Sequence, residues 1–395
     1  MINFKYNSKS LLILQKGGTI MELADIRKEI DEIDSQLLPL FLRRMKCAEQ
    51  VAAAKKEKNL PVFNAQREQE ILDRAAEKAG EYGQAVRGIY SAMMSVSRER
   101  QYQLLESGGT LRELAASSME NLLTDSVKVA CPGVAGAFTH RAARTVFPGG
   151  EMTFHPRFEQ VFEAVEQGAA DFGVIPVENS SAGSVVDVYD LILRYRFYIV
   201  RAVTLPVRHF LCGTENSGEI QIVFSHPQAL AQCSDFLNQK GWKKQEYSNT
   251  AAAAKMLSLE RLHHAAVICS KEAAGKYGLT VLEENIQNAR DNCTRFIVIS
   301  RTPCLPQNAD KISLCFSLPN IPGALHQVLG RFALNGLNLT KIESRPIPGK
   351  AFEYDFYLDF TGNLHETHTL ELLCSLSEEL PRFTFLGNYL ETKEL

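Results

Sequence analysis

Three basic residues near the start of the chain have a spacing that suits a helical binding site. Arg44 and Lys55 are eleven residues apart, about three full helical turns, so a helix places both side chains on one face. Arg27 lies seventeen residues before Arg44 and points elsewhere, so it can serve the same cavity only from a second copy of the chain. Because the formal net charge is only -3, an acidic substrate has to be held by such local clusters rather than by the global field.

Polar residues one helical turn apart accompany these cations. Asn64 and Glu68 form one such pair, and Ser97 and Gln101 form another. Spacing alone is equally typical of a solvated, charged helix surface, so these positions do not define a site by themselves.

A second group of candidates combines hydroxyl, amide and guanidinium side chains. A glycine-rich turn at residues 133–139 follows an apolar run, and such turns can receive an anion at the N-terminus of the next helix. Pro-Val-Glu-Asn-Ser-Ser-Ala-Gly at residues 176–183 and Asn-Cys-Thr-Arg-Phe at residues 292–296 also adjoin apolar runs. Taken singly, each has a structural alternative: an Asn-Ser-Ser helix cap, a threonine in a strand, or an arginine in a surface ion pair.

The elements expected to carry the first group are helices. Apolar residues recur at three- and four-residue spacing over residues 22–58, and two further helices are expected over about 64–81 and 84–105. Pro39 should kink the first helix or remove a hydrogen bond. Three such helices, the first about 50 Å long, cannot bury their apolar faces as a compact monomer, so we expect an intertwined dimer.

The second group lies in a region of different periodicity. A polar linker is expected from Ser107 to about Ser126. Short apolar runs then alternate with helical stretches, which predicts an α/β domain with a mostly parallel sheet. The predicted strands cover residues 127–130, 172–175, 198–203, 220–224, 265–270 and 296–300.

After a break at residues 302–306, the order of elements becomes strand, helix, strand, strand, helix, strand. The strands are expected near residues 312–318, 337–344, 354–360 and 383–389, with helices after Pro322 and from Thr367. This βαββαβ order predicts a ferredoxin-like α+β sandwich.

Composition sets the broad class. The chain has 395 residues, 45% hydrophobic and 23% charged, which predicts two or three globular domains. Its 9 cysteines form no C-x-x-C pair, which argues against a disulfide framework or zinc site, and no apolar run could span a bilayer. We therefore expect a cytoplasmic protein that needs no metal and no cofactor, and that binds neither nucleic acid nor membrane. Residues 1–20 are expected to be an extension outside the fold, with Met21 a possible natural start.

The helical region resembles the all-helical chorismate mutases. The segment from Leu23 to Asp34, the cations Arg44 and Lys55, and Pro61-Val62 leading into Gln66-Arg67-Glu68 carry this likeness. The resemblance implies that Lys55 and Gln101 donate to the ether oxygen of chorismate, and it assigns substrate binding to Arg27 of the partner subunit, Arg44, Asn64, Arg67, Glu68 and Ser97. Asn64 departs from the family pattern, which has aspartate there, so we expect altered substrate affinity rather than inactivity.

The α/β region resembles prephenate dehydratase, through its P-x-E-N-S-x-x-G and T-R-F signatures and Ser225-His226-Pro227-Gln228. The likeness implies a two-lobed fold like type II periplasmic binding proteins, with the active site between the lobes. It implies that Thr294 is the catalytic hydroxyl and Arg295 a substrate carboxylate clamp. The other residues expected to line the pocket are Glu178, Asn179, Ser180, His226 and Gln228.

The C-terminal sandwich resembles an ACT domain, a module that binds amino acids. The resemblance implies a phenylalanine site built from two segments, with Gly323, Ala324 and Leu325 in one and Glu343, Ser344 and Arg345 in the other.

The order of the three units is similar to that of the bifunctional chorismate mutase/prephenate dehydratases. The expected boundaries are 21–106 for the mutase, 107–126 for the linker, 127–302 for the dehydratase and 303–395 for the ACT domain. This family makes phenylpyruvate from chorismate, is inhibited by phenylalanine and forms homo-oligomers. Two alternatives stay open: an arogenate dehydratase, and a degenerate phenylalanine-responsive binding protein without activity.

Overall fold

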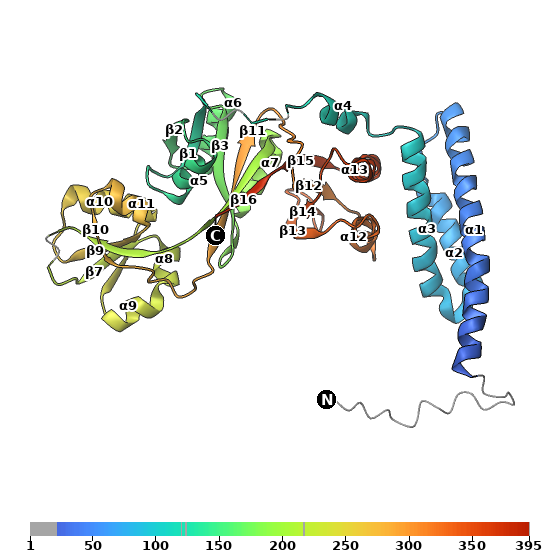
Figure 1. The fold of residues 1–395 in the computed structure, drawn as a ribbon, viewed down its shortest axis with the longest axis horizontal. Coiled ribbons are helices and arrows are strands. Elements are labelled where there is room, and N and C mark those ends of the chain that lie inside the picture. The colour runs from blue at the N-terminus through green and yellow to red at the C-terminus, as the bar shows by residue number, and fades with distance from the viewer. Residues whose placement is uncertain (1–21, 120, 123–124, 216–217, 395) are drawn as a thin grey trace. The chain divides into compact units, whose positions relative to one another are not determined.

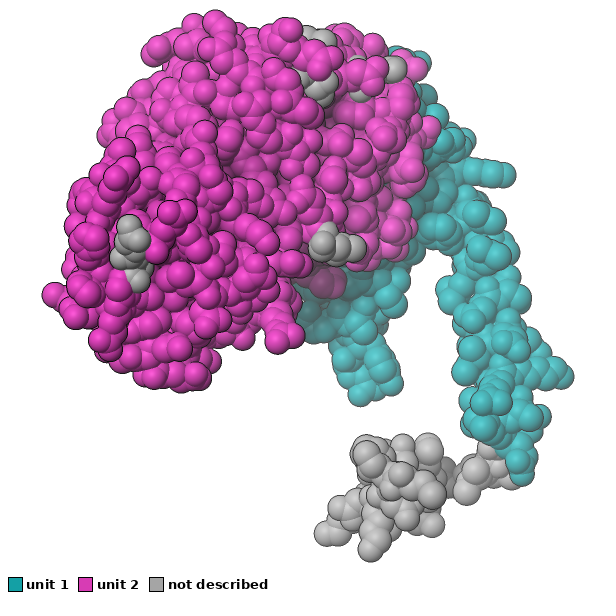
Figure 2. All heavy atoms as spheres, turned by 60° about the vertical axis from the view of Figure 1, so that its left-hand side comes forward, with its two compact units in different colours: residues 1–105 teal, residues 106–395 magenta. Residues whose placement is uncertain are grey.

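The computed structural model describes residues 22–119, 121–122, 125–215 and 218–394. The expected N-terminal extension, residues 1–20, lies outside the described residues. The chain divides into two compact units, residues 1–105 and residues 106–395, which are described separately below (Figure 2). Over the described residues, no helix is long and apolar enough to cross a membrane. All nine cysteines are free thiols.

The first unit is helical, as the sequence predicts (Figure 1). Helix α1 spans Leu23–Glu57, α2 spans Ala65–Ala79 and α3 spans Gly83–Leu104, with a short 3₁₀ turn between the last two. Helix α1 continues through Pro39 without interruption, so the ring removes one donor but does not end the helix. Asn64 begins α2 as its N-cap, because its side chain accepts a hydrogen bond from the Arg67 amide at 2.9 Å.

The N-terminal half of α1 presents an uncovered apolar stripe. Its members recur at three- and four-residue spacing and are each 41–61% exposed; they are Leu23, Ile26, Ile30, Ile33 and Leu37. In contrast, the C-terminal half of α1 packs on α3 and buries Ala48 and Ala52. One copy of the unit therefore leaves about half of its longest helix without a packing partner.

The second unit begins with a helix where the sequence analysis expects a polar linker. Helix α4 (Gly109–Ser117) buries Leu111 in the core of the C-terminal sandwich, and Arg112 pairs with Glu371 at 2.7 Å. At Gly108 the backbone has a φ of 81°, and a Cβ there would lie 2.4 Å from that of Cys374. The segment was expected to be a linker because its composition is polar, but its few apolar residues are enough to dock it.

The large lobe of the α/β region is built on a seven-stranded sheet with the path β16-β5-β11-β3-β1-β2, and β4 added to β3. Helix α5 (Phe138–Val146) packs in one core beside this sheet, while α6 (Phe158–Glu166) and α7 (Val186–Tyr195) belong to another. The strands are β1 (Lys128–Pro132), β2 (Glu151–His155), β3 (Phe172–Asn179), β4 (Gly183–Ser184), β5 (Tyr198–Pro206), β11 (Cys293–Ser300) and β16 (Glu391–Lys393).

The small lobe has a five-stranded sheet in the order β10-β6-β9-β7-β8. Its strands are β6 (Phe210–Gly213), β7 (Ile222–Ser225), β8 (Lys243–Glu246), β9 (Ala265–Cys269) and β10 (Thr280–Glu283). Its helices are α8 (Pro227–Gln232), α9 (Ser234–Lys240), α10 (Thr250–Glu260) and α11 (Lys271–Lys276).

Both sheets are mixed, which corrects the expectation of mostly parallel strands. Strand β11 runs antiparallel to both β3 and β5, and β6 runs antiparallel to both β9 and β10. The chain leaves the large lobe after β5 and returns at β11 (Figure 1). On its return, β11 runs antiparallel to its two neighbours. Apolar periodicity can locate a strand, but it does not give the direction of the strand in the sheet.

The C-terminal sandwich has the predicted βαββαβ order and an antiparallel sheet, β13-β14-β12-β15. Its elements are β12 (Lys311–Ser317), α12 (Ala324–Leu334), β13 (Leu339–Pro346), β14 (Tyr354–Thr361), α13 (Thr367–Glu379) and β15 (Thr384–Tyr389). One face of this sheet packs on the core that the two helices share, which includes Phe316, Phe332 and Phe360.

The other face of the sandwich sheet packs on the large lobe. Cys315, Tyr357 and Tyr389 of the sandwich share a single buried core with residues of α6, α7 and β3. The contact is so close at Gly387 that a Cβ there would lie 2.1 Å from the Ile199 carbonyl oxygen of β5. After β15 the chain adds β16 to the large sheet, parallel to β5. The last residues thus tie the sandwich to the lobe.

Candidate functional site

The two signatures of the large lobe meet at the ends of β3 and β11. In the register of this antiparallel pair Thr294 stands opposite Asn179. The Asn179 amide donates to Thr294 Oγ1 at 2.9 Å, to Asn292 Oδ1 at 2.9 Å and to the Cys293 carbonyl at 3.1 Å. The side chain of Asn179 is 8% exposed and therefore sits in one fixed orientation.

The turn after β3 is held by the same asparagine. Asn179 Oδ1 accepts from the backbone amides of Ser181 and Ala182 at 3.1 and 3.0 Å. Ser180 Oγ accepts from the Cys293 amide at 2.9 Å. These bonds explain why amide and hydroxyl residues follow the strand: they close the turn and fix its position against β11.

The small lobe contributes to this site from α8. Gln228 Nε2 donates to Asn179 Oδ1 at 3.4 Å, so residues of both lobes meet there. His226 caps α8, because its Nδ1 accepts from the Gln228 amide at 3.3 Å. Burial lowers the pKa of His226, although nearby Glu246 opposes the shift. A neutral His226 is the form that can accept this bond.

The glycine-rich turn of the large lobe also contacts the small lobe. Tyr277 Oη donates to the Ala135 carbonyl at 2.6 Å and Ser270 Oγ donates to the Gly136 carbonyl at 3.4 Å. Gly136 has a φ of 90°, and a Cβ there would lie 3.2 Å from Ala273 Cα. The turn is therefore a contact between the lobes in this conformation.

The Thr294 hydroxyl is the group with reactive potential. It accepts a hydrogen bond from the Asn179 amide, which directs its own proton outward and polarises it. A threonine hydroxyl is too weak an acid to release a proton at neutral pH, so what this group can offer is a hydrogen bond.

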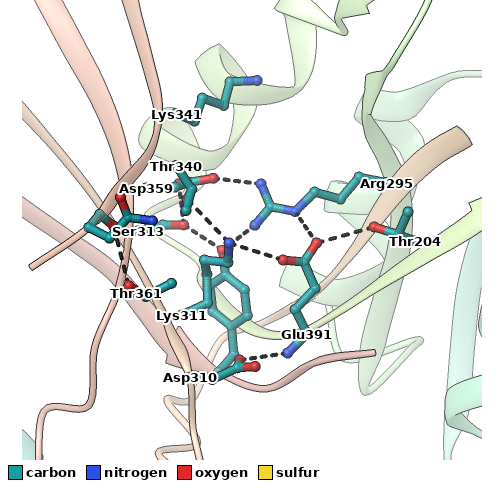
Figure 3. Close-up of polar contacts among 12 residues, drawn as sticks. Thr204, Arg295, Asp310, Lys311, Ser313, Thr340, Lys341, Asp359, Thr361 and Glu391 are labelled. Atoms are coloured by element: carbon teal, nitrogen blue, oxygen red, sulfur yellow. Dashed lines mark hydrogen bonds and ion pairs between the residues drawn. The ribbon is translucent and has the colours of Figure 1, made fainter. Parts of the chain in front are cut away.

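Glu178 and Arg295 lie elsewhere. Successive residues of a strand point to opposite faces, and here Arg295 pairs with Asp359 and Glu391 (Figure 3). Glu178 pairs with Lys341. All three partners follow residue 302. The predicted role of Arg295 as a substrate carboxylate clamp stays a prediction, but in this conformation two carboxylates already match its charge.

The predicted residues of the helical unit form two sets of contacts, one around Arg44 and one around Lys55. Arg44 Nη1 donates to Ser97 Oγ at 2.5 Å and to the Met93 carbonyl at 3.2 Å. Lys55 donates to the Val62 carbonyl, and Glu68 pairs with Arg98. Burial lowers the pKa of Lys55; Glu68 counteracts this and Arg98 reinforces it.

Gln101 is 7% exposed and its Nε2 donates to the Ser97 carbonyl at 3.2 Å. Its buried Oε1 accepts no hydrogen bond from any of the residues that the structure describes. By contrast, Arg27, Asn64 and Arg67 are exposed, and Arg67 pairs with Glu70 at 3.3 Å. One copy of the chain thus joins Arg44, Ser97 and Gln101 in one set of contacts and places Lys55 near Glu68 and Arg98, while Arg27 remains exposed.

The sandwich residues predicted to bind an amino acid occupy two elements. Gly323 has a φ of 83° and is the N-cap of α12, which begins at Ala324 and Leu325. Glu343, Ser344 and Arg345 lie on β13. Glu343 and Arg345 are half-buried on the face toward α7, where Arg345 lies 3.5 Å from Asp190, while Ser344 is exposed.

Several residues of these clusters were not singled out by sequence. Asn292 lies two residues before Thr294 of the T-R-F signature and accepts a hydrogen bond from the Asn179 amide, and Arg98 follows Ser97. Proximity to a motif was the available signal for both. No sequence signal indicated Lys341, Asp359 or Glu391, because these residues reach β3 and β11 only when the sandwich packs on the large lobe.

Comparison with known families matches each of the three regions that hold these residues. The model for chorismate mutase type II matches residues 26–102, that for prephenate dehydratase matches residues 129–304, and that for the ACT domain matches residues 313–378. The region beyond residue 105 thus has a dehydratase part of two lobes, and the sandwich is an ACT domain.

Individual relatives extend the match over the whole chain. The bifunctional chorismate mutase/prephenate dehydratase of Aquifex aeolicus is 34% identical, over 93% of this chain and 98% of its own. Arogenate dehydratase 2 of Petunia hybrida is 36% identical over 80% of this chain and 86% of its own. The solved prephenate dehydratase of Arthrobacter aurescens, in complex with L-Phe, is 32% identical with a TM-score of 0.62, covering 67% of this chain and 90% of its own. The order of the three matched regions and the relative that spans all of them show that the chain belongs to the bifunctional chorismate mutase/prephenate dehydratase family.

Proposed function

We propose that this chain rearranges chorismate to prephenate in its helical unit and converts prephenate to phenylpyruvate at the Asn179–Thr294 cluster. The observation that carries the dehydratase assignment is the hydrogen bond from the Asn179 amide to Thr294 Oγ1 at 2.9 Å, beside Gln228 of the other lobe. We assign the mutase to residues 21–106, the linker to 107–126, the dehydratase to 127–302 and the ACT domain to 303–395, as the sequence analysis expects.

The mutase step needs only orientation and charge stabilisation. The rearrangement is pericyclic: one C–O bond breaks and one C–C bond forms, while negative charge gathers on the ether oxygen. We assign Lys55 and Gln101 as donors to that oxygen, and Arg44 as the group that holds a carboxylate. Ser97 and Glu68 line the same cavity, Glu68 taking the substrate hydroxyl, with Asn64 and Arg67 at the start of α2.

A second copy of the chain completes this cavity in our proposal. The exposed apolar stripe on α1 supports a dimer in which two such helices pack on one another. Arg27 lies within the stripe's span and would then reach the partner's cavity. An intertwined dimer thus accounts for both the stripe and the isolated cation.

The dehydratase step removes two groups from prephenate. The bond to the ring carboxylate breaks, its electron pair forms a new ring double bond, and CO₂ leaves. The C–O bond to the ring hydroxyl breaks on the opposite carbon, and the departing oxygen takes a proton from solvent to become water. Aromatisation drives the reaction, so a hydrogen bond from Thr294 to the departing oxygen is the assistance that the protein needs to supply. Asn179, Ser180, His226 and Gln228 shape the pocket.

We also propose that phenylalanine binds the ACT domain and inhibits the enzyme. The related structure from Arthrobacter aurescens is a complex with L-Phe, and this chain has a helix start at Gly323 whose backbone is open to a ligand: no atom lies within 4 Å of a Cβ built there. Inhibition requires that phenylalanine bind a less active conformation more tightly than the active one.

Arogenate is the competing substrate for the dehydratase. Several relatives are named arogenate dehydratases, among them that of Petunia hybrida. Arogenate carries an amine where prephenate carries a keto group, so the same cleft could accept either. The ratio of the two kcat/KM values decides between them.

One assay tests the whole proposal. Purified protein is given chorismate, and phenylpyruvate is followed by its ultraviolet absorbance while phenylalanine is titrated in. We expect phenylpyruvate to form and its rate to fall with phenylalanine. If the protein turns over neither chorismate nor prephenate, the enzymatic assignment is wrong and a binding protein remains.

A further inference from the structure

The ACT domain holds the two strands that carry the proposed catalytic cluster. Strands β3 and β11 each have two consecutive motif residues that point to opposite faces. Asn179 and Thr294 are paired in register and face the cluster, while their neighbours Glu178 and Arg295 are likewise paired in register and face the ACT domain. Each of these neighbours forms an ion pair with a residue beyond the dehydratase part.

Arg295 lies in the more buried of the two contacts (Figure 3). Its Nη1 donates to Asp359 Oδ2 of β14 at 2.5 Å and its Nη2 donates to Tyr389 Oη of β15 at 2.8 Å. Its Nε lies 3.0 Å from Glu391 Oε1 of β16, as an ion pair rather than a well-formed hydrogen bond. The side chains of Arg295, Asp359 and Glu391 are only 7–11% exposed.

The charges in this cluster depend on one another. Burial acts against the charged form of Arg295, but Tyr389, Asp359 and Glu391 outweigh it and raise the arginine pKa. A buried ion that loses its partner is strongly destabilised. If Asp359 were withdrawn, the one carboxylate left to Arg295 would be Glu391, which also pairs with Lys311 at 3.2 Å. Two buried cations would then share one anion, which favours a shift of Arg295, and Thr294 is its neighbour in the strand.

The second contact joins β3 to β13. Lys341 Nζ lies 3.4 Å from Glu178 Oε2, donates to Ser184 Oγ of β4 at 2.7 Å and stands 4.9 Å from the ring centre of Tyr189. Its side chain is 9% exposed. The contact therefore reaches β3, the β4 turn that follows Asn179, and α7 at once.

We propose that Lys341, Asp359 and Arg295 are positioning residues of the dehydratase: through them the ACT sheet fixes β3 and β11 so that Asn179 and Thr294 meet. Displacement of a catalytic group by about 1 Å can reduce a rate about 10²-fold. The ACT domain thus supports catalysis directly. A movement of its sheet displaces Arg295, which is adjacent to the reacting residue Thr294. The inference rests on the proposed placement of Thr294 in the dehydratase site.

The competing account makes Arg295 a substrate carboxylate clamp. The two accounts differ in what neutralising Asp359 does. If Arg295 binds prephenate, Asp359→Asn frees its charge, so the KM for prephenate falls or stays the same and kcat is not reduced. If Arg295 positions β11, the same substitution lowers kcat and leaves KM nearly unchanged, because the loss is confined to the transition state.

The test uses the full-length protein with Asp359→Asn and Lys341→Met, and measures prephenate kcat and KM. We expect each variant to lose about tenfold or more in dehydratase kcat, with a KM within about twofold of the parent. Lys341→Arg should recover most of the rate because it keeps the charge. Mutase kcat should be unchanged in all three.

Two matched controls separate this role from general damage to the ACT domain. Asp355→Asn removes a buried carboxylate of the same strand whose partner, Arg382 at 3.1 Å, belongs to the ACT domain. Lys350→Met removes an exposed lysine that pairs with Glu353. Both should keep the parental dehydratase kcat. Thermal unfolding of every variant shows that the comparison is made on folded protein.

The outcomes distinguish this inference from the proposed function. Unchanged kcat in both Asp359→Asn and Lys341→Met, with Thr294→Ala inactive, would overturn the positioning role alone. An active Thr294→Ala would overturn the assignment of the site. Equal loss of kcat in the controls would show that the ACT domain acts only through overall stability.

Discussion

Asn179 and Thr294 stand opposite each other on antiparallel strands, and the amide of the first donates to the hydroxyl of the second at 2.9 Å. They lie 115 positions apart in sequence, in two signatures separated by the whole small lobe. Because Asn179 also donates to Asn292 and to the Cys293 carbonyl, its amide cannot rotate to present the oxygen to Thr294. In our proposal, the threonine proton is therefore left for the substrate.

Thr294→Ala should abolish dehydratase activity and spare mutase activity, because the hydrogen bond to the departing oxygen is lost while the helical unit is untouched. Thr294→Ser keeps the hydroxyl and should retain a large part of the rate. Parallel assays with chorismate and prephenate make the measurement. Retained dehydratase activity in the alanine variant would remove Thr294 from the mechanism.

Lys55→Ala should reduce mutase kcat by a factor on the order of 10² to 10³, since the donor to the ether oxygen is removed. Burial lowers the pKa of Lys55, and only the ammonium form donates as a cation. Mutase activity of the parent should therefore decline at a lower pH than an ordinary lysine would give, as the pH rises through that pKa. A loss under about threefold in the variant, or an alkaline decline that persists in it, argues against this role.

Protonation of His226 should limit the dehydratase on the acid side. Burial lowers its pKa, so the unfolded chain binds this proton more readily than the folded one. The stability that neutral His226 contributes is present above the unfolded pKa and is lost as pH falls through the folded pKa. His226→Asn keeps a cap acceptor for α8 and cannot titrate. We expect its pH–rate profile to lack the acid decline of the parent, and an identical decline in both would assign it to another group.

Charge placed on the apolar stripe of α1 should dissociate the dimer. The double variant Ile30→Glu, Leu37→Glu converts two side chains that are 50% and 56% exposed in one copy but buried in our proposed dimer. Light scattering coupled to size exclusion should show a smaller species, and mutase activity should fall because Arg27 is supplied by the partner. Lys46→Glu, on an exposed position of the same helix, is the control. A parent that is already monomeric and active as a mutase contradicts the proposal.

Gly387→Ala should weaken the attachment of the ACT domain to the large lobe. Its Cβ would lie 2.1 Å from the Ile199 carbonyl oxygen, so β15 must move away from β5. Overpacking of this kind lowers the free energy of unfolding by about 1–3 kcal/mol. Gly330→Ala, where no atom lies within 4 Å of the new Cβ, should be neutral or slightly stabilising in α12. Denaturant unfolding measures both, and equal stability of the two variants would contradict the close contact.

The sequence by itself determined the elements and their chemistry. Apolar periodicity located α1, α2, α3 and the strands and helices of the ACT domain to within a few residues, because each of these elements carries its apolar residues at a regular spacing. Local motifs likewise indicated Asn179, Ser180 and Thr294, since a turn or strand end needs those residue types where they occur. The direction of β11 and the packing of α4 on the ACT domain were not predicted, because both depend on contacts with segments that are distant in the chain.

Only the tertiary structure decided which way the motif residues face. Glu178 and Arg295 are part of the same signatures as Asn179 and Thr294, and sequence offers no means of assigning one residue to the hydrogen-bonded cluster and its neighbour to the contact with the ACT domain. Strand pleating fixes that alternation, and the partners Lys341, Asp359 and Glu391 come from β13, β14 and β16, whose position depends on packing of the whole C-terminal half. Contacts between residues distant in the chain carry no local pattern, so they become visible only when the sheets are assembled.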